Sequence, residues 1–300
     1  MDSYKNSEDL INELISNGVL VKDKSKVKDI IEKNSYYFIV DSYGRYFKDQ
    51  SNKYVSDVSF DEIYALYAFD EKIRSLFMKY ILKIERMIKT RIELLVIEKY
   101  DMYDYLKDLY FDQKFSKQEI NDFIKSINNK VDTNYYYHKK IEYHKQHNGN
   151  LPIWLMMRII TFGAMSKYYK YLNQKDRQTI SKYFNISDKQ LKQILINLNN
   201  VRNICAHGDE LFNYRNKCGI KLTNIDSFYI KKDNLTNLYI IIKCTKLFLD
   251  GQDYREFIEL FYKGLEILEK QLHTINITEI LKIIGFNIEP RLSYHTGLLK

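Results

Sequence analysis

Residues 201–207 carry the two side chains of this sequence that best suit chemistry on a phosphodiester. They read Val-Arg-Asn-Ile-Cys-Ala-His, and Gly208 follows directly. The Arg202 guanidinium presents a fork of N–H donors that fits phosphate oxygens, and the His207 imidazole gains and loses a proton near neutral pH. These two groups suffice to cleave RNA without a metal ion, because one moves a proton and the other balances charge on the phosphate.

A helix is predicted to position these side chains, beginning after a Ser187 N-cap and ending at Gly208. Its predicted buried face, read from helical spacing, comprises Leu191, Ile194, Leu195, Leu198, Val201 and Cys205. Asn203 and His207 share one side of this helix because they are four residues apart, whereas Arg202 points about 140° away from His207. The C-terminal end of a helix favours the charged imidazolium of His207.

The spacing of Arg202 and His207 also fits a purely structural interpretation. In that interpretation the arginine binds carbonyl oxygens near the helix end, and the histidine is a terminal polar residue. Asp70, Glu85 and Arg91 lie on a second predicted helix. They either form a polar network beneath the motif or make ordinary salt bridges between helices.

The rest of the sequence predicts an all-α fold. Only 2 prolines and 10 glycines interrupt it, which favours long helices over a turn-rich β-sandwich. Ser59-Phe60-Asp61-Glu62 is a capping box, and the apolar stripe behind it predicts one long helix to about Tyr100. Further helices are predicted at residues 7–17, 25–34, 116–128, 133–146, 152–172, 176–184, 187–207, 234–249, 253–273 and 278–284.

Three parts are expected along the chain. Residues 1–58 form a small N-terminal subdomain of helices and aromatic, irregular segments. Residues 59–275 form the main helical domain, and residues 276–300 add a short helix and a tail.

Charge and cysteine usage narrow the class of protein. The net charge of +8 favours a polyanionic partner such as nucleic acid. Cys205, Cys218 and Cys244 are odd in number and lack CxxC spacing, which indicates a reducing compartment. The chain starts with polar residues, and no apolar run is long enough to span a membrane. We therefore expect a soluble cytoplasmic protein that does not contact a membrane.

A second candidate site lies in residues 135–147, where aromatic and basic side chains are interleaved. The candidate RNA-binding residues are Tyr136, Lys139, Lys140 and Lys145, because such surfaces stack bases and follow phosphates. The alternative is a solvated helix edge. His144 and His147 are spaced for a shared metal, but no further set of ligands is evident, so we expect no metal and no other cofactor.

Several segments, taken together and in order, resemble the Abi-like family of bacterial abortive-infection proteins. That family belongs to the HEPN superfamily (higher eukaryotes and prokaryotes nucleotide-binding). The resemblance covers most of residues 8–215, and its segments are residues 69–74, 84–92, 151–154, 161–167 and 198–207. The Arg-Asn-x-x-Ala-His signature of the family is complete at residues 202–207.

The resemblance implies an all-α HEPN-like bundle and a homodimer. Two such motifs, usually one from each protomer, then form one composite site. It also implies metal-independent RNA cleavage, in which the ribose 2′-OH attacks the adjacent phosphorus, a histidine moves the proton and an arginine offsets charge on the phosphorane. By position, Arg202 and His207 are the catalytic residues, and Asn203 supports them.

The sequence departs from the family pattern after His207, where a second histidine and Arg-Leu-Trp-Asn-Arg usually follow. The replacements are Gly208 for that histidine, Glu210 for the first arginine, Phe212 for the tryptophan and Tyr214 for the last arginine. Leu211 and Asn213 match the pattern, and Arg215 lies next to the position of the last arginine. Some HEPN proteins are adenylylated on a tyrosine two residues after the histidine, but that position is Asp209 here.

These observations lead to the hypothesis of a homodimeric, metal-independent endoribonuclease that acts on RNA as an antiphage abortive-infection toxin. The main alternative is a non-catalytic RNA-binding or regulatory HEPN module, which the departures after His207 keep open. A third alternative is a purely structural interaction protein.

Overall fold

The computed structural model describes residues 5–216, 219–220 and 236–286, and these residues form an all-α fold. Isolated β-bridges occur, such as Lys48 with Tyr54, but the described residues form no sheet. The predicted fold class is therefore confirmed. None of the described helices is both long enough and apolar enough to cross a membrane.

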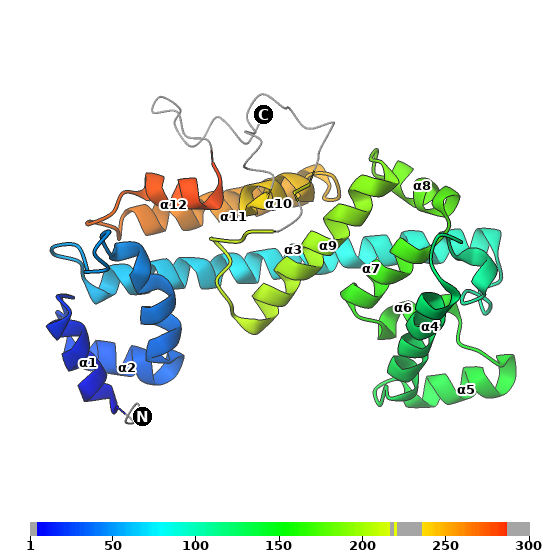
Figure 1. Ribbon diagram of the computed structural model, residues 1–300, viewed down its shortest axis with the longest axis horizontal. Coiled ribbons are helices and arrows are strands. Elements are labelled where there is room, and N and C mark those ends of the chain that lie inside the picture. The colour runs from blue at the N-terminus through cyan, green and yellow to red at the C-terminus, as the bar shows by residue number, and fades with distance from the viewer. Residues whose placement is uncertain (1–4, 217–218, 221–235, 287–300) are drawn as a thin grey trace.

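Helix α3 (Phe60–Lys99) is the spine of the molecule and runs through its whole length in Figure 1. Its 40 residues span about 60 Å. The predicted capping box begins it, because the Ser59 N–H donates to Glu62 Oε2 at 3.2 Å and the Glu62 N–H donates to Ser59 Oγ at 3.3 Å. The buried positions of α3 recur at helical spacing, so its apolar residues serve helices on more than one side.

The other elements are arranged around α3. One end of the molecule holds α1 (Ser7–Ser16), α2 (Lys24–Asn34), the π-helical turn η1 (Tyr37–Asp41) and the 3₁₀ turn η2 (Gly44–Phe47). The other end holds the 3₁₀ turn η3 (Asp108–Tyr110), α4 (Lys117–Asp132), α5 (His138–Asn148), α6 (Ile153–Ile159), α7 (Phe162–Tyr171) and α8 (Gln174–Lys182).

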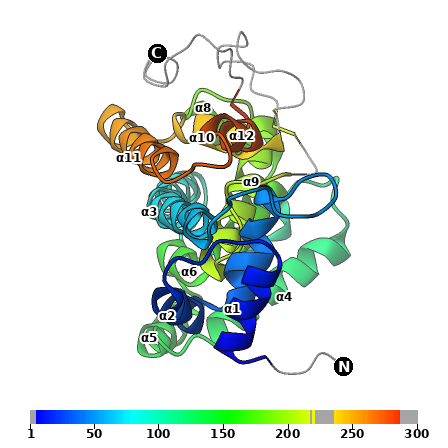
Figure 2. The same cartoon turned by 90° about the vertical axis from the view of Figure 1, so that its left-hand side faces the viewer.

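Further helices pack along the spine. Helix α9 (Asp188–His207) crosses α3 and contacts α10 (Leu238–Thr245), whereas α11 (Gly251–Glu269) packs on α3 with α12 (Ile277–Ile284) against it. Figure 2 looks along α3 and shows α11 and α12 on one side of it, with α1 and α2 on the other. One apolar core extends from Leu10 to Ile284, and the three-part division of the chain remains a prediction.

The prediction of a single helix over residues 152–172 is wrong in one respect, because this segment forms two helices, α6 and α7. Ile160 has an extended backbone, and Thr161 Oγ1 accepts the Ala164 N–H as the N-cap of a new helix. The freed Ile160 carbonyl accepts Lys89 Nζ at 2.8 Å. Consecutive β-branched residues favour such a break, since they lose side-chain freedom in a helix. Residues 234–235 of another predicted helix lie outside the described residues, and α10 begins at Leu238.

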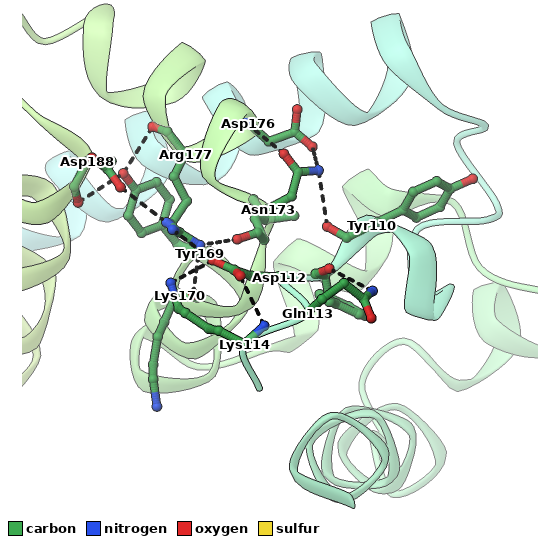
Figure 3. Close-up of polar contacts among 12 residues, drawn as sticks. Tyr110, Asp112, Gln113, Lys114, Tyr169, Lys170, Asn173, Asp176, Arg177 and Asp188 are labelled. Atoms are coloured by element: carbon green, nitrogen blue, oxygen red, sulfur yellow. Dashed lines mark hydrogen bonds and ion pairs between the residues drawn. The ribbon is translucent and has the colours of Figure 1, made fainter. Parts of the chain in front are cut away.

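A buried arginine fixes the start of α9 (Figure 3). Arg177 of α8 pairs through Nη2 with Asp112 at 3.1 Å and through Nε with Asp188, the first residue of α9, at 3.4 Å. Its Nη1 donates to the carbonyl oxygens of Lys170 and Leu172. A single side chain thus ties α7, α8, α9 and the segment before α4 together, which orients the helix that carries the motif.

Candidate functional site

Helix α9 forms as the sequence predicts. Ser187 caps it, and the Ser187–Gln190 capping box is closed from both sides at 3.2 and 3.0 Å. The predicted face from Leu191 to Val201 is buried, while Cys205 is half-buried. Gly208 ends the helix with a left-handed backbone (φ 78°), and its N–H donates to the Ile204 carbonyl. The motif therefore occupies the last two turns of a well-anchored helix.

Arg202 is half-buried and poorly partnered. Its Nη1 lies 3.5 Å from Asn203 Oδ1, which is at the limit of a hydrogen bond. Its Nε is buried without an acceptor, and the guanidinium makes no ion pair with any described residue. A buried donor without an acceptor costs about 1–3 kcal/mol. The arginine is therefore not committed to a carboxylate among the described residues.

His207 lies exposed in the last turn of α9, and Asn203 lies half-buried one turn earlier. The structure thus brings Arg202 and Asn203 together. Within the described residues no hydrogen bond joins Arg202 to His207, as the helical geometry predicts. Between residues 193 and 207 the chain contains no acidic side chain. This part of α9 therefore carries no negative charge that would repel a phosphate.

The segment after His207 is held by a buried carboxylate of α3. Asp70 is fully buried, and its two oxygens accept the backbone N–H groups of Leu211 at 2.9 Å and Phe212 at 2.7 Å. Arg74 pairs with it at 2.6 Å, and the Tyr43 hydroxyl donates to it at 2.7 Å. Burial raises the pKa of Asp70, while these four donors oppose that rise. The segment just after the motif is thereby fixed to the spine and to Tyr43 of the N-terminal segment.

Three residues after His207 that depart from the pattern of the resembling family have partners in residues 38–46. Glu210 Oε2 accepts Arg45 Nη2 at 2.6 Å, and the Tyr46 hydroxyl donates to its other oxygen. Phe212 is buried against Tyr46, with ring centroids 4.9 Å apart. A Cβ added at Gly208 would meet the Phe38 ring at 3.9 Å. The residues that depart from the pattern therefore pack against, or pair with, side chains of residues 38–46.

The second candidate site lies far from the motif. Tyr136 is 85% exposed, Lys139 and Lys140 are exposed, and Lys145 pairs with Asp132 at 2.5 Å. Helix α5 packs next to the residues that follow α3, because the His144 ring centroid lies 6.4 Å from that of Tyr103.

The segment after His207 binds instead at Asp70, near the beginning of α3. The two places are separated by about 40 Å of helix, and Figure 1 shows them apart. The structure does not combine the two predicted sites into one.

Comparison with models of known protein families assigns the chain to a family. A family model described as "Abi-like protein" matches residues 29–213. The chain belongs to the Abi-like protein family. The match includes Asp70, the whole of α9 and the segment that Asp70 holds. No curated protein and no solved structure matched this Abi-like chain.

Sequence reasoning found only part of the surroundings of the motif in this Abi-like protein. Of the three residues suggested for a network, Asp70 binds the motif segment, whereas Glu85 pairs with Lys89 and Arg91 lies over the Tyr183 ring. The missed residues are Tyr43, Arg45, Tyr46 and Arg74. One signal was available, because Asp70 and its i+4 neighbour interrupt the apolar stripe of α3 with opposite charges.

Among the described residues, no three His, Cys, Asp or Glu side chains gather as a metal site would require. Cys205 and Cys244 are free thiols, and Cys218 lies outside the described residues. Burial raises the pKa of the Cys205 thiol to about 12. That thiol is therefore protonated at neutral pH and is not an activated nucleophile.

Proposed function

We propose that this Abi-like protein is a metal-independent HEPN-type endoribonuclease that acts as an antiphage abortive-infection toxin. The family supports a role in abortive infection. The observation that carries the enzymatic part is the half-buried Arg202, which has an unsatisfied Nε and lies on the same helix end as the exposed His207. In this proposal an RNA phosphate binds the guanidinium at its Nη groups, which make no ion pair with a described residue.

In the proposed reaction His207 moves the proton as the ribose 2′-OH attacks the adjacent phosphorus. Arg202 binds the phosphate and offsets the charge that develops on the phosphorane. Asn203 orients the substrate or the guanidinium from one turn earlier. The products are a 2′,3′-cyclic phosphate and a free 5′-hydroxyl, so atoms balance without water, metal or cofactor.

A homodimer completes this site, since the reaction needs a base for the 2′-OH and an acid for the leaving oxygen. The outward face of α9 carries Ile196, Asn200, Asn203 and His207 at spacings of four, three and four residues. Ile196 is exposed although it is apolar. A face without carboxylates and with an exposed isoleucine suits pairing of two α9 helices, which brings two histidines together.

The test is cleavage of labelled RNA by purified protein in EDTA. Wild type is expected to cleave, and His207→Ala is expected to lower the rate by about 100- to 10,000-fold, the usual contribution of a general acid or base. His273→Ala, an exposed histidine far along the sequence, is the matched control and is expected to retain the rate. Equal rates in all three proteins would rule out the assignment.

A parallel test uses living cells. Expression of wild type is expected to arrest bacterial growth, and His207→Ala or Arg202→Ala is expected to relieve the arrest while the protein remains folded. Equal toxicity of wild type and both variants would contradict the ribonuclease.

The alternative is a non-catalytic RNA-binding or regulatory HEPN module. Two observations favour it: glycine replaces the second histidine, and a carboxylate, Glu210, stands where an arginine is usual. For this alternative, wild type binds RNA without cleaving it in the EDTA assay, and Arg202→Ala weakens that binding.

Helix α5 is proposed as a separate RNA contact. Lys139 and Lys140 are exposed beside the exposed rings of Tyr135 and Tyr136, which suits a phosphate backbone and stacked bases. Lys145 contributes less, because Asp132 already neutralises it. Given its distance from α9, this surface would bind RNA remote from the cleaved bond.

A further inference from the structure

An open cavity of about 610 Å³ lies in the N-terminal subdomain, between α1 and residues 36–54. Its volume falls within the range of small-molecule sites. The side chains that define its chemistry are Tyr36, Tyr37, Tyr54, Asp41, Arg45 and Lys48. With Lys5 and Glu13, which pair with each other, three aromatic rings, three cations and two carboxyl groups line one space.

This cavity adjoins the motif at two points. Arg45 lines it, and the same guanidinium pairs at 2.6 Å with Glu210, three residues after His207. Phe38 is the nearest group to Gly208, as described above, and its sequence neighbour Tyr37 lines the cavity. Arg45 directly, and Tyr37 through its neighbour Phe38, thus connect the lining of the cavity to residues just after the end of α9.

Two neighbouring aromatic side chains, Tyr37 of the cavity lining and Phe38, are exposed to solvent. Phe38 is 46% exposed and Tyr37 is 57% exposed, and both belong to the π-helical turn η1. Irregular π-helical turns often occur at functional sites. Exposed rings beside a basic groove are the usual platform for bases of single-stranded nucleic acid.

The charged groups supply the remaining contacts. Lys48 Nζ lies 4.9 Å from the Tyr54 ring centroid and makes no ion pair with a described residue. It is therefore open to a phosphate. Asp41 offers carboxyl oxygens as acceptors, which suit the exocyclic amino group of adenine, cytosine or guanine. Uracil has no amino group, and its N3–H is flanked by two carbonyl oxygens that a carboxylate repels. The other carboxylate of the lining, Glu13, is held by Lys5 at 3.0 Å.

We propose that this cavity binds one nucleotide of the single-stranded RNA that is cleaved at His207. The base stacks on Tyr37, its amino group donates to Asp41, and its phosphate binds Lys48. The adjoining base stacks on Phe38, which leads the strand to the end of α9. This inference rests on the proposed function, because it assigns the flanking part of the same substrate.

The test measures RNA binding without cleavage, using full-length protein with the His207→Ala substitution. Fluorescently labelled oligoadenylate and oligouridylate of equal length are the probes, and fluorescence anisotropy gives each Kd. Oligoadenylate is expected to bind more tightly. Added Tyr37→Ala or Phe38→Ala is expected to weaken binding by about 5- to 100-fold, the range for loss of one stacked base. Leu260→Ala, an equally exposed apolar residue on α11, is the control and is expected to change nothing.

Two further variants separate the polar contacts. Lys48→Ala is expected to weaken both probes alike, because it removes a phosphate contact. Asp41→Ala is expected to abolish the preference for oligoadenylate while the affinity for oligouridylate stays within about twofold, since uracil has no amino group for Asp41 to accept. Unchanged affinity in the Tyr37, Phe38 and Lys48 variants would overturn the proposal.

Photo-crosslinking provides a measurement that does not depend on those variants folding. Ultraviolet irradiation of the His207→Ala protein bound to oligoadenylate is expected to attach RNA to residues 36–48. Crosslinks confined to α5 would overturn the proposal. The two proposals fail separately. If wild type cleaves RNA but the cavity variants bind it normally, the ribonuclease proposal stands and the nucleotide site is wrong. If the cavity variants weaken binding but wild type does not cleave, the nucleotide site stands and the ribonuclease proposal is wrong.

Discussion

Arg177 and Arg202 lie on neighbouring helices, and their surroundings differ in almost every respect. Arg177 is 4% exposed, and each of its three nitrogens has a partner: two carboxylates and two carbonyl oxygens (Figure 3). Arg202 is half-buried, with one weak contact to Asn203 and a buried Nε without an acceptor. Arg177 therefore stabilises the packing of its neighbouring segments, whereas the charge of Arg202 is not neutralised by a described carboxylate.

The contrast teaches how a helix can be held firmly while the side chains proposed to act on RNA stay outside the contacts that hold it. Buried charges fix α9 at both ends, through Arg177 and Asp188 at its start and through Asp70 just after its C-terminus. The residues of the motif take no part in either anchor. Such preorganisation lets a site meet its ligand without first giving up internal contacts.

The largest effect is expected from Arg177→Ala. Removing this side chain leaves Asp188 without its cation in a mostly buried place and leaves Asp112 with Lys114 alone, and it breaks the contacts to two carbonyl oxygens, which together should cost about 3–5 kcal/mol of unfolding free energy. Urea denaturation measures this. Lys99→Ala, which removes a more exposed cation from the nearby Asp176, is the control and should cost less. A loss below about 1 kcal/mol for Arg177→Ala, the value of an exposed pair, would show that the two arginines differ less than their contacts indicate.

A smaller but more specific effect is expected from Asp70→Asn. The amide keeps the shape of the side chain, but only one oxygen remains for the Leu211 and Phe212 N–H groups, and Arg74 loses its counter-charge. We expect a loss of about 2–3 kcal/mol in unfolding free energy. RNA cleavage should fall further than this loss alone explains, because the end of the motif is released.

The control for that variant is Asp61→Asn on the same helix. Asp61 pairs with Lys26 on the surface, and an exposed pair contributes less than about 1 kcal/mol. If both variants lose stability and cleavage equally, Asp70 has no special role in holding the motif.

Gly208→Ala should cost about 1 kcal/mol of unfolding free energy, because a left-handed backbone is unfavourable for any side chain with a Cβ. The φ of this residue is 78°. Gly251→Ala is the matched control, since nothing lies within 4 Å of a Cβ there and its φ is not positive. Thermal unfolding of both variants tests the difference, and equal stability would mean that the helix end adapts without strain.

The smallest effect concerns the distant helix α5. Changing Lys139, Lys140 and Lys145 together to Ala should reduce the log–log slope of RNA binding against salt by roughly two units. The loss is smaller than one unit for each of the three lysines because Lys145 is already paired with Asp132. Binding isotherms between low and moderate salt measure the slope. An unchanged slope would make the helix an ordinary solvated surface.

The sequence was sufficient for those features that local patterns determine. The capping box at Ser59 and Glu62 and the apolar stripe behind it predicted α3, and Ser187 and Gly208 predicted the two ends of α9. Helix periodicity also predicted that Arg202 and His207 point in different directions. Each of these features depends on residues within a few positions of one another.

The remainder depends on contacts between distant segments. Asp70 binds backbone N–H groups 141 and 142 residues further along, and Arg45 pairs with Glu210 across 165 residues. Every residue except proline carries the same backbone N–H group. Residue types therefore do not indicate which backbone N–H groups a distant carboxylate such as Asp70 will bind. The break at Thr161 was missed because capping by its hydroxyl competed with an apolar pattern that continued through it.

The most direct test of the account joins two measurements on Arg202→Ala: the rate of RNA cleavage in EDTA and the unfolding free energy. The account predicts a rate at least about 100-fold lower, as expected for loss of a group that stabilises charge in the transition state. It also predicts a change of less than about 1 kcal/mol in stability, because the one hydrogen bond that Arg202 makes with the described residues is weak. A rate equal to that of wild type, or a loss of activity matched by a loss of stability as large as that of Arg177→Ala, would contradict it.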